Sequence, residues 1–128
     1  MKSNLITIKG SSASGKTTQA LRIASTFSGK TMVISSEEWP RDLMVRLIKL
    51  GVPRERLETH YLFPNDHSER DFVVGDFTGV QNVMLDVNTR EDGRWMRLAK
   101  AIENMGLNVI ITIHKPVHHP RTLPNYFK

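Results

Sequence analysis

The stretch that decides the fold is GSSASGKTT, residues 10–18. It follows a short apolar run, Leu5–Ile8, and precedes a segment with helix-forming residues, Gln19–Ala24. It matches the pattern G-x-x-x-x-G-K-[ST] of a phosphate-binding loop at every specified position. Glycines let the backbone curl until successive N–H groups point at phosphate oxygens, and the following helix adds its positive amino end. The motif between a strand and a helix therefore predicts a nucleotide phosphate site.

All nine residues of the motif are expected to surround the phosphates: Gly10, Ser11, Ser12, Ala13, Ser14, Gly15, Lys16, Thr17 and Thr18. The ammonium group of Lys16 should reach the β- and γ-phosphates, and the hydroxyl of Thr17 should bind magnesium. The expected ligands are therefore ATP and Mg²⁺.

Length and composition predict one soluble domain over residues 1–128. No apolar run approaches the roughly 20 residues that span a bilayer, so no membrane partner is expected. The absence of a secretory signal favours a cytoplasmic location. The chain has no cysteine, which excludes disulfides, Cys-ligated zinc and thiol catalysis. A net charge of +5 favours polyanions such as nucleic acid, although a mildly basic surface that attracts ATP is an equal alternative.

Strand-like and helix-like segments alternate, which predicts an α/β domain in three layers, with helices flanking a mostly parallel sheet. Strands are expected at about 4–9, 31–35 and 108–113, and helices at about 16–27, 41–50 and 91–105. Between them, 57–63, 72–74 and 83–85 are strand-like, and 64–68 is a loop. The proline-rich tail, about 116–128, is expected to be irregular.

Two adjacent carboxylates, Glu37 and Glu38, follow the second expected strand. The carboxyl end of a parallel strand faces the same side as the phosphate loop. A carboxylate there could orient the water that attacks the γ-phosphate or accept its proton. Alternatively, the pair is an acidic start to the helix at Pro40, favoured by the helix dipole.

Magnesium should be supported by an aspartate that follows an apolar strand. Asp86 after Val83–Leu85 fits best, and Asp76 is the alternative. His114, at the end of the last strand, is a candidate hydrogen-bond partner of the γ-phosphate. A zinc site at the three C-terminal histidines is disfavoured, because neither cysteine nor a convincing fourth ligand accompanies them.

Together these residues resemble the RecA-like ATPase superfamily, in particular the branch of KaiC, the RadA/Sms repair proteins and DnaB-type replicative helicases. The segment Thr31–Glu38 looks like the second strand of that branch, which ends in S-x-E-E or S-L-E-M. Arg46 and Leu50–Val52 look like its R-x-x-x-L-G segment. Met84–Asp86 and Ile110–Pro116 resemble the magnesium-aspartate strand and the final strand of hexameric phage helicases.

The resemblance implies a role for each matching position. Glu37 would polarise the attacking water with Glu38 as its neighbour, Asp86 would support magnesium, and His114 would sense the γ-phosphate. The last strand would lie between the strand of the phosphate loop and that of Asp86. Implied partners are a nucleoside triphosphate, single-stranded DNA or a DNA replication or recombination complex, and further copies of the chain.

The chain departs from this family in being short, as a reduced, phage-type member would be. The arginine finger of the hexameric members has only weak candidates, Lys115 and Arg121. Two other functions stay open. A small-molecule kinase is one, because the loop SASGKTT at 12–18 also looks like that of nucleoside kinases. The other is a nucleotide-binding regulatory module with little turnover, which the lack of a clear arginine finger would allow. A kinase lid should carry several arginines, whereas the short insertion at 64–71 holds only Arg70.

Overall fold

The computed structural model describes residues 4–10, 15–64, 72–90 and 93–114. Over these ranges strands and helices alternate. In chain order the elements are β1 (Leu5–Gly10), α1 (Lys16–Ala24), β2 (Thr31–Ser35), α2 (Pro40–Lys49), α3 (Arg54–His60), β3 (Tyr61–Leu62), the 3₁₀ helix η1 (Val74–Phe77), β4 (Asn82–Thr89), α4 (Arg94–Asn104) and β5 (Asn108–His114).

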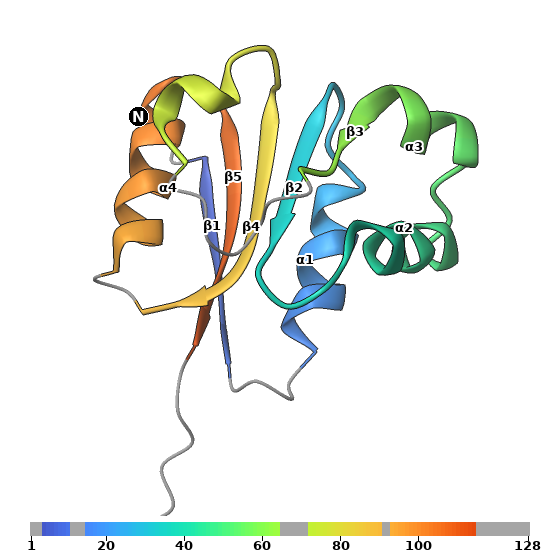
Figure 1. Cartoon of the computed structure of the whole chain (residues 1–128), viewed down its shortest axis with the longest axis horizontal. Coiled ribbons are helices and arrows are strands. Elements are labelled where there is room, and N and C mark those ends of the chain that lie inside the picture. The colour runs from blue at the N-terminus through green and yellow to red at the C-terminus, as the bar shows by residue number, and fades with distance from the viewer. Residues whose placement is uncertain (1–3, 11–14, 65–71, 91–92, 115–128) are drawn as a thin grey trace, which may run out of the picture.

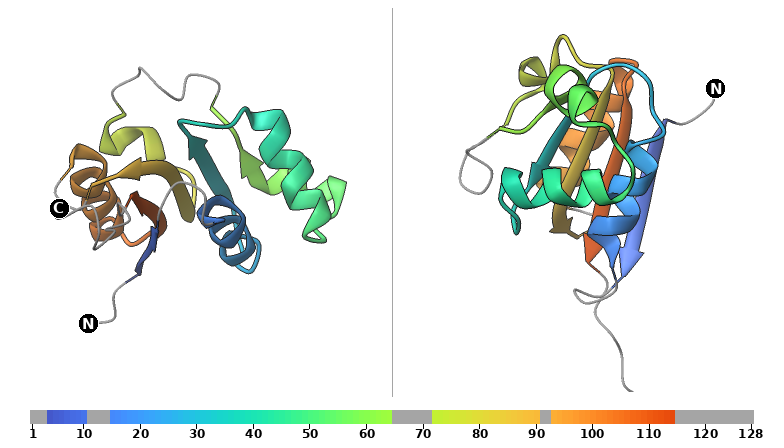
Figure 2. Two further views of the ribbon diagram at one scale, coloured as in Figure 1. Left: turned by 90° about the horizontal axis from the view of Figure 1, so that it is seen from below. Right: turned by 90° about the vertical axis from the view of Figure 1, so that its right-hand side faces the viewer.

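The five described strands form one parallel sheet in the order β1-β5-β4-β2-β3 (Figure 1). Helices cover both faces: α1, α2 and α3 lie on one side, and α4 with η1 lies on the other (Figure 2). The domain is therefore α/β, as expected. The predicted neighbours of the last strand are also confirmed, because β5 lies between β1 and β4.

Alternation along the central strands explains why both faces are covered. On β4, Met84 packs with α1 and α2, and the next residue, Leu85, packs with α4. On β5, Ile110 and Ile111 divide between the same two faces. All four side chains are buried. A strand buried on both faces has no need of polar alternation, which is why these segments are continuously apolar in sequence.

The helix boundaries follow local chemistry. Pro40 is the first residue of α2, where its missing N–H has no intrahelical partner to lose. Gly51 follows the cap of α2 with φ of 99°, and Gly106 follows that of α4 with φ of 97°. Glycine adopts this left-handed conformation without the steric cost that other residues incur.

Four expectations were wrong in position or type. α1 ends at Ala24, not at Phe27, because the hydroxyls of Ser25 and Thr26 bond to carbonyls of the preceding turn. The strand expected at 57–63 is mostly α3, and only Tyr61–Leu62 is extended. This segment begins after Pro53 with the helix-forming run RERLE, which outweighs the apolar residues beyond it.

The strand expected at 72–74 is also absent. η1 begins at Val74, and the carboxylate of Asp76 accepts a hydrogen bond of 2.9 Å from the backbone N–H of Val73. Local bonding of this kind competes with a sheet. The last helix begins at Arg94 and not at Glu91, which lies outside the described residues, as does the tail 116–128.

Hydrogen bonds of the buried Asn82 side chain connect the amino ends of β2, β4 and β5. The Asn108 side chain donates to Asn82 Oδ1 at 2.9 Å. The Asn82 amide in turn donates to Ser28 O at 2.8 Å and to Thr31 Oγ1 at 3.1 Å. Asn82 is 1% exposed and Thr31 is also buried, so loss of the Asn82 side chain would remove hydrogen bonds that are shielded from water.

We expect Asn82→Ala to lower the free energy of unfolding by roughly 1–3 kcal/mol, the usual cost of leaving a buried polar group without its partner. Chemical denaturation measures this change. The matched control is Asn104→Ala, at the exposed end of α4, which should change stability far less. Equal stability of Asn82→Ala and wild type would contradict the role given to this network.

Candidate functional site

The carboxyl ends of β1, β5, β4 and β2 lie along one edge of the sheet, beside the amino end of α1 (Figure 1). Gly10 ends β1, and Gly15 stands just before α1 with φ of 80°. Lys16, the first residue of α1, is 5% exposed, and its Nζ donates to Gly10 O at 2.9 Å. The lysine therefore folds back over the start of the loop, with its charge next to the helix terminus that would meet a phosphate.

The centre of the site is the carboxylate of Asp86, which is 1% exposed. Its Oδ2 accepts a hydrogen bond of 2.8 Å from Thr17 Oγ1 of α1 and one of 3.0 Å from Ser35 Oγ of β2. Three elements thus meet at one oxygen. Because the Thr17 hydroxyl is the donor in its hydrogen bond to Asp86, the lone pairs on Thr17 Oγ1 stay available for a cation.

The second carboxylate oxygen, Asp86 Oδ1, is buried and has no hydrogen-bond partner among the described residues. Burial raises the pKa of Asp86, and the charges of Glu37 and Glu38 raise it further, whereas the hydrogen bonds from Thr17 and Ser35 oppose the shift. A buried carboxylate with an unpaired oxygen is unfavourable unless a cation or a proton joins it.

Oxygen ligands of this type suit Mg²⁺, which keeps several waters and takes one or two protein ligands together with substrate phosphates. Thr17 Oγ1 and the unpaired oxygen of Asp86 fit that requirement. Within the described ranges, no three acidic, histidine or cysteine side chains gather closely enough to hold a metal by themselves. A cation here would therefore take its remaining ligands from phosphate and water.

Ser35, the last residue of β2, also holds the turn that carries the two glutamates. Its Oγ accepts hydrogen bonds from the backbone N–H of Glu37 at 3.2 Å and of Glu38 at 3.1 Å. The pair therefore lies in a turn before α2, whose first residue is Pro40, and not in the first turn of the helix. Glu37 is exposed, and its charge acts on Asp86.

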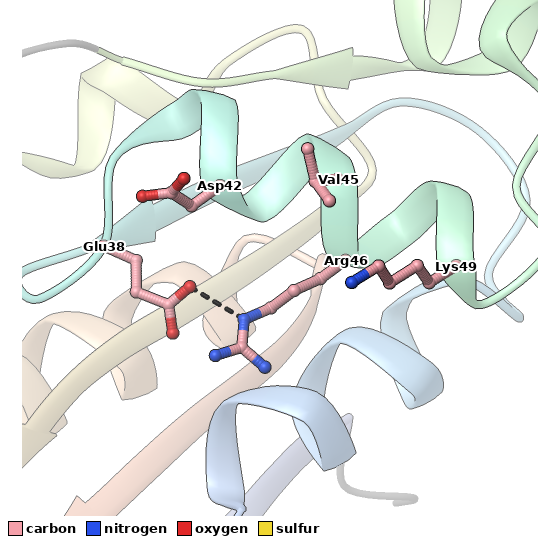
Figure 3. Close-up of a pocket in the computed structure, with 5 residues that line it drawn as sticks. All are labelled: Glu38, Asp42, Val45, Arg46 and Lys49. Atoms are coloured by element: carbon pink, nitrogen blue, oxygen red, sulfur yellow. Dashed lines mark hydrogen bonds and ion pairs between the residues drawn. The ribbon is translucent and has the colours of Figure 1, made fainter.

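Glu38 is engaged by α2. Arg46 donates from Nε to Glu38 Oε1 at 2.8 Å (Figure 3) and from Nη1 to Thr18 Oγ1 at 2.7 Å. Arg46 thus joins the glutamate turn to α1, within an open pocket of about 590 Å³ that Asp42 and Lys49 also line. The ion pair is partly exposed, so it contributes to geometry more than to stability.

The two magnesium candidates lie at opposite ends of the sheet. β4 continues through Asp86 to Thr89, and its register with β5 shifts between Leu85 and Thr89, so Asp86 lies within an irregular part of the strand and not just past its end. Asp76 lies in η1, which precedes the amino end of β4 (Figure 1). Of the two aspartates, therefore, only Asp86 lies beside Thr17.

His114 ends β5 and pairs in register with Gly10, which places it next to the start of the phosphate loop. It is half-buried. The expected residues Ser11, Ser12, Ala13 and Ser14 lie outside the described residues, and so do Arg70, Lys115 and the histidines and arginine of the tail. The structure brings together Lys16, Thr17, Asp86, the glutamate turn and His114 at one edge of the sheet.

Two connections within the site were not predicted from the sequence. The hydroxyl of Ser35 joins Asp86 to the glutamate turn, and Arg46 joins Glu38 to Thr18. A serine two residues before a candidate catalytic carboxylate is the available signal for the first. The second has no local signal, because Arg46 and Thr18 lie 28 residues apart in sequence.

Comparison of the sequence with models of known protein families gives no match, and comparison with curated proteins gives none either.

Among the helices of the described residues, none is both long and apolar enough to cross a bilayer.

The raised pKa of Asp86 predicts how stability depends on pH in the ligand-free protein. The folded state binds the proton more tightly than the unfolded state, so Asp86 contributes stability at low pH. This contribution is lost as the pH rises from the ordinary value of 3.8 through the raised pKa. Unfolding free energies of wild type and Asp86→Asn, measured by denaturation across this pH range, should therefore diverge in favour of the variant as the pH rises. A difference that does not change with pH would contradict the assignment.

Proposed function

We propose that the chain is a magnesium-dependent ATPase of the RecA-like type that acts with DNA or with a DNA replication or recombination complex. The observation that carries this proposal is the joining of Thr17, Asp86 and Ser35 beside the glutamate turn. It links the phosphate-loop helix, a buried carboxylate and a candidate base. The strand order also agrees with the resemblance, since β5 separates β1 from β4.

The residues gathered at this end of the sheet would each contribute to binding ATP. The loop amides and the ammonium group of Lys16 would bind the β- and γ-phosphates. Thr17 and Asp86 would hold Mg²⁺, which neutralises charge on the phosphate oxygens when bound. The side chain of His114 would donate a hydrogen bond to the γ-phosphate from the neighbouring strand end.

Glu37 would act on the attacking water. As the water oxygen bonds to the γ-phosphorus, the bond to the β–γ bridging oxygen breaks, ADP leaves and the proton passes to the Glu37 carboxylate. Glu38 is less suited to this part, because Arg46 already holds its carboxylate in an ion pair.

The proposal of a DNA partner rests on the net charge of the chain. The chain carries +5 at pH 7, which favours association with a polyanion. A contribution from phosphate contacts would make the affinity for single-stranded DNA fall steeply with salt.

Phosphate release from ATP alone, with single-stranded DNA, and with a panel of nucleosides separates this proposal from its alternatives. Stimulation by DNA supports it, phosphorylation of a nucleoside would identify a kinase, and nucleotide binding without turnover would identify a regulatory module.

We expect Glu37→Gln to lower ATP hydrolysis by roughly 10²- to 10⁴-fold, the range that a general base contributes, while ATP binding survives. Glu38→Gln should reduce hydrolysis less. Steady-state phosphate release and equilibrium nucleotide binding measure the two properties separately. Lys16→Ala is the binding-deficient reference, and Glu58→Gln, on the exposed surface of α3, is the matched control.

A larger loss of ATP hydrolysis in Glu38→Gln than in Glu37→Gln would identify Glu38 as the general base in place of Glu37. Wild-type rates in both variants would refute the mechanism. Unchanged ATP affinity in Lys16→Ala would contradict the phosphate loop itself.

A further inference from the structure

The hydroxyl of Ser35 uses its full hydrogen-bonding capacity. It donates to Asp86 Oδ2 at 3.0 Å and accepts from the backbone N–H groups of Glu37 at 3.2 Å and Glu38 at 3.1 Å. A serine hydroxyl has one donor and two acceptor positions, so each of them is occupied. Ser35 is 2% exposed, which keeps water from competing for these bonds.

Ser35 lies where the sheet ends and the turn begins. It is the last residue of β2 that pairs with β4, opposite Asp86, and the next residue still donates from Ser36 N to Asp86 O at 3.1 Å. Beyond that bond the chain leaves the ladder toward α2. The two amides held by Ser35 therefore fix the direction in which the turn departs.

We propose that Ser35 is a positioning residue, which fixes the turn of Glu37 and Glu38 relative to Asp86 and so sets where the Glu37 carboxylate meets the attacking water. This inference rests on the proposed ATPase function. Glu37 is exposed, and the point from which its side chain extends is fixed by the backbone N–H that Ser35 holds. A displacement of about 1 Å at a reacting group can lower a rate roughly 100-fold.

Ser35 could affect catalysis in two ways, by positioning Glu37 or by its hydrogen bond to Asp86. A double-mutant cycle separates these two effects. Ser35→Ala, Glu37→Gln and the double variant are compared for kcat, KM for ATP and Mg²⁺ dependence. Any effect of Ser35→Ala that persists in the Glu37→Gln background belongs to the hydrogen bond to Asp86 or to general stability. An effect that disappears there belongs to Glu37.

The expected result is a loss of kcat in Ser35→Ala of roughly 10-fold or more, with KM for ATP changed by less than about 2-fold. In the Glu37→Gln background the same substitution should change kcat by less than about 2-fold, because no catalytic carboxylate is left to position. Ser35→Thr, which keeps the hydroxyl, should recover most of the rate. Ser25→Ala is the matched control, since its hydroxyl bonds to Arg22 O at the far end of α1.

Equal fold-losses of kcat in the two backgrounds would overturn the positioning role and leave the ATPase intact. A Glu37→Gln variant with wild-type turnover would instead refute the proposed mechanism, and this inference with it. Hydrogen exchange of the wild-type amides is a test that needs no variant to fold. Protons on the backbone nitrogens of Glu37 and Glu38 should exchange at least about 10-fold more slowly than in an unstructured peptide. Exchange at the unstructured rate would overturn the proposal.

Discussion

The arrangement of the site depends on two hydrogen bonds to one buried oxygen, Asp86 Oδ2. Through Thr17 they hold α1, and through Ser35 they hold β2 and the turn that follows it. The partner oxygen Oδ1 is buried without a bond among the described residues, and burial raises the pKa of the group. A carboxylate in this state does little for the stability of the ligand-free fold. Under the proposed function, a cation shared with Thr17 and with bound phosphates would compensate this buried charge.

The topology brings these groups together across a large separation in sequence. Thr17 of α1 and Asp86 of β4 lie 69 residues apart, and β5 lies between β1 and β4 in the sheet. Since all described strands are parallel, their carboxyl ends share an edge, and residues that end different strands become neighbours there. The same rule explains the opposite position of Asp76, which precedes β4 and therefore lies at the amino ends of the strands.

The α/β class, β2 and the edge that carries the site could be predicted, because each rests on a strong local pattern. Thr31–Ser35 is a continuous apolar run with a polar end, and the motif at 10–18 specifies a strand, a loop and a helix. The region 53–81 could not be predicted, since the short apolar groups near Leu57 and Phe72 suit a strand or a helix, and packing decides between them. The contact of Arg46 with Thr18 was equally inaccessible, because it depends on how α2 lies against α1.

The most direct test of the account is to locate the metal in the complex with ATP. Mn²⁺ replaces Mg²⁺, and its paramagnetic broadening of backbone amide signals is mapped by NMR in wild type and in Asp86→Asn. The account predicts strong broadening at Thr17, Ser35 and Asp86 in the wild type, weak broadening at Asp76, and a higher Mn²⁺ requirement in the variant. Broadening centred on Asp76, or the same metal requirement in both proteins, would contradict it.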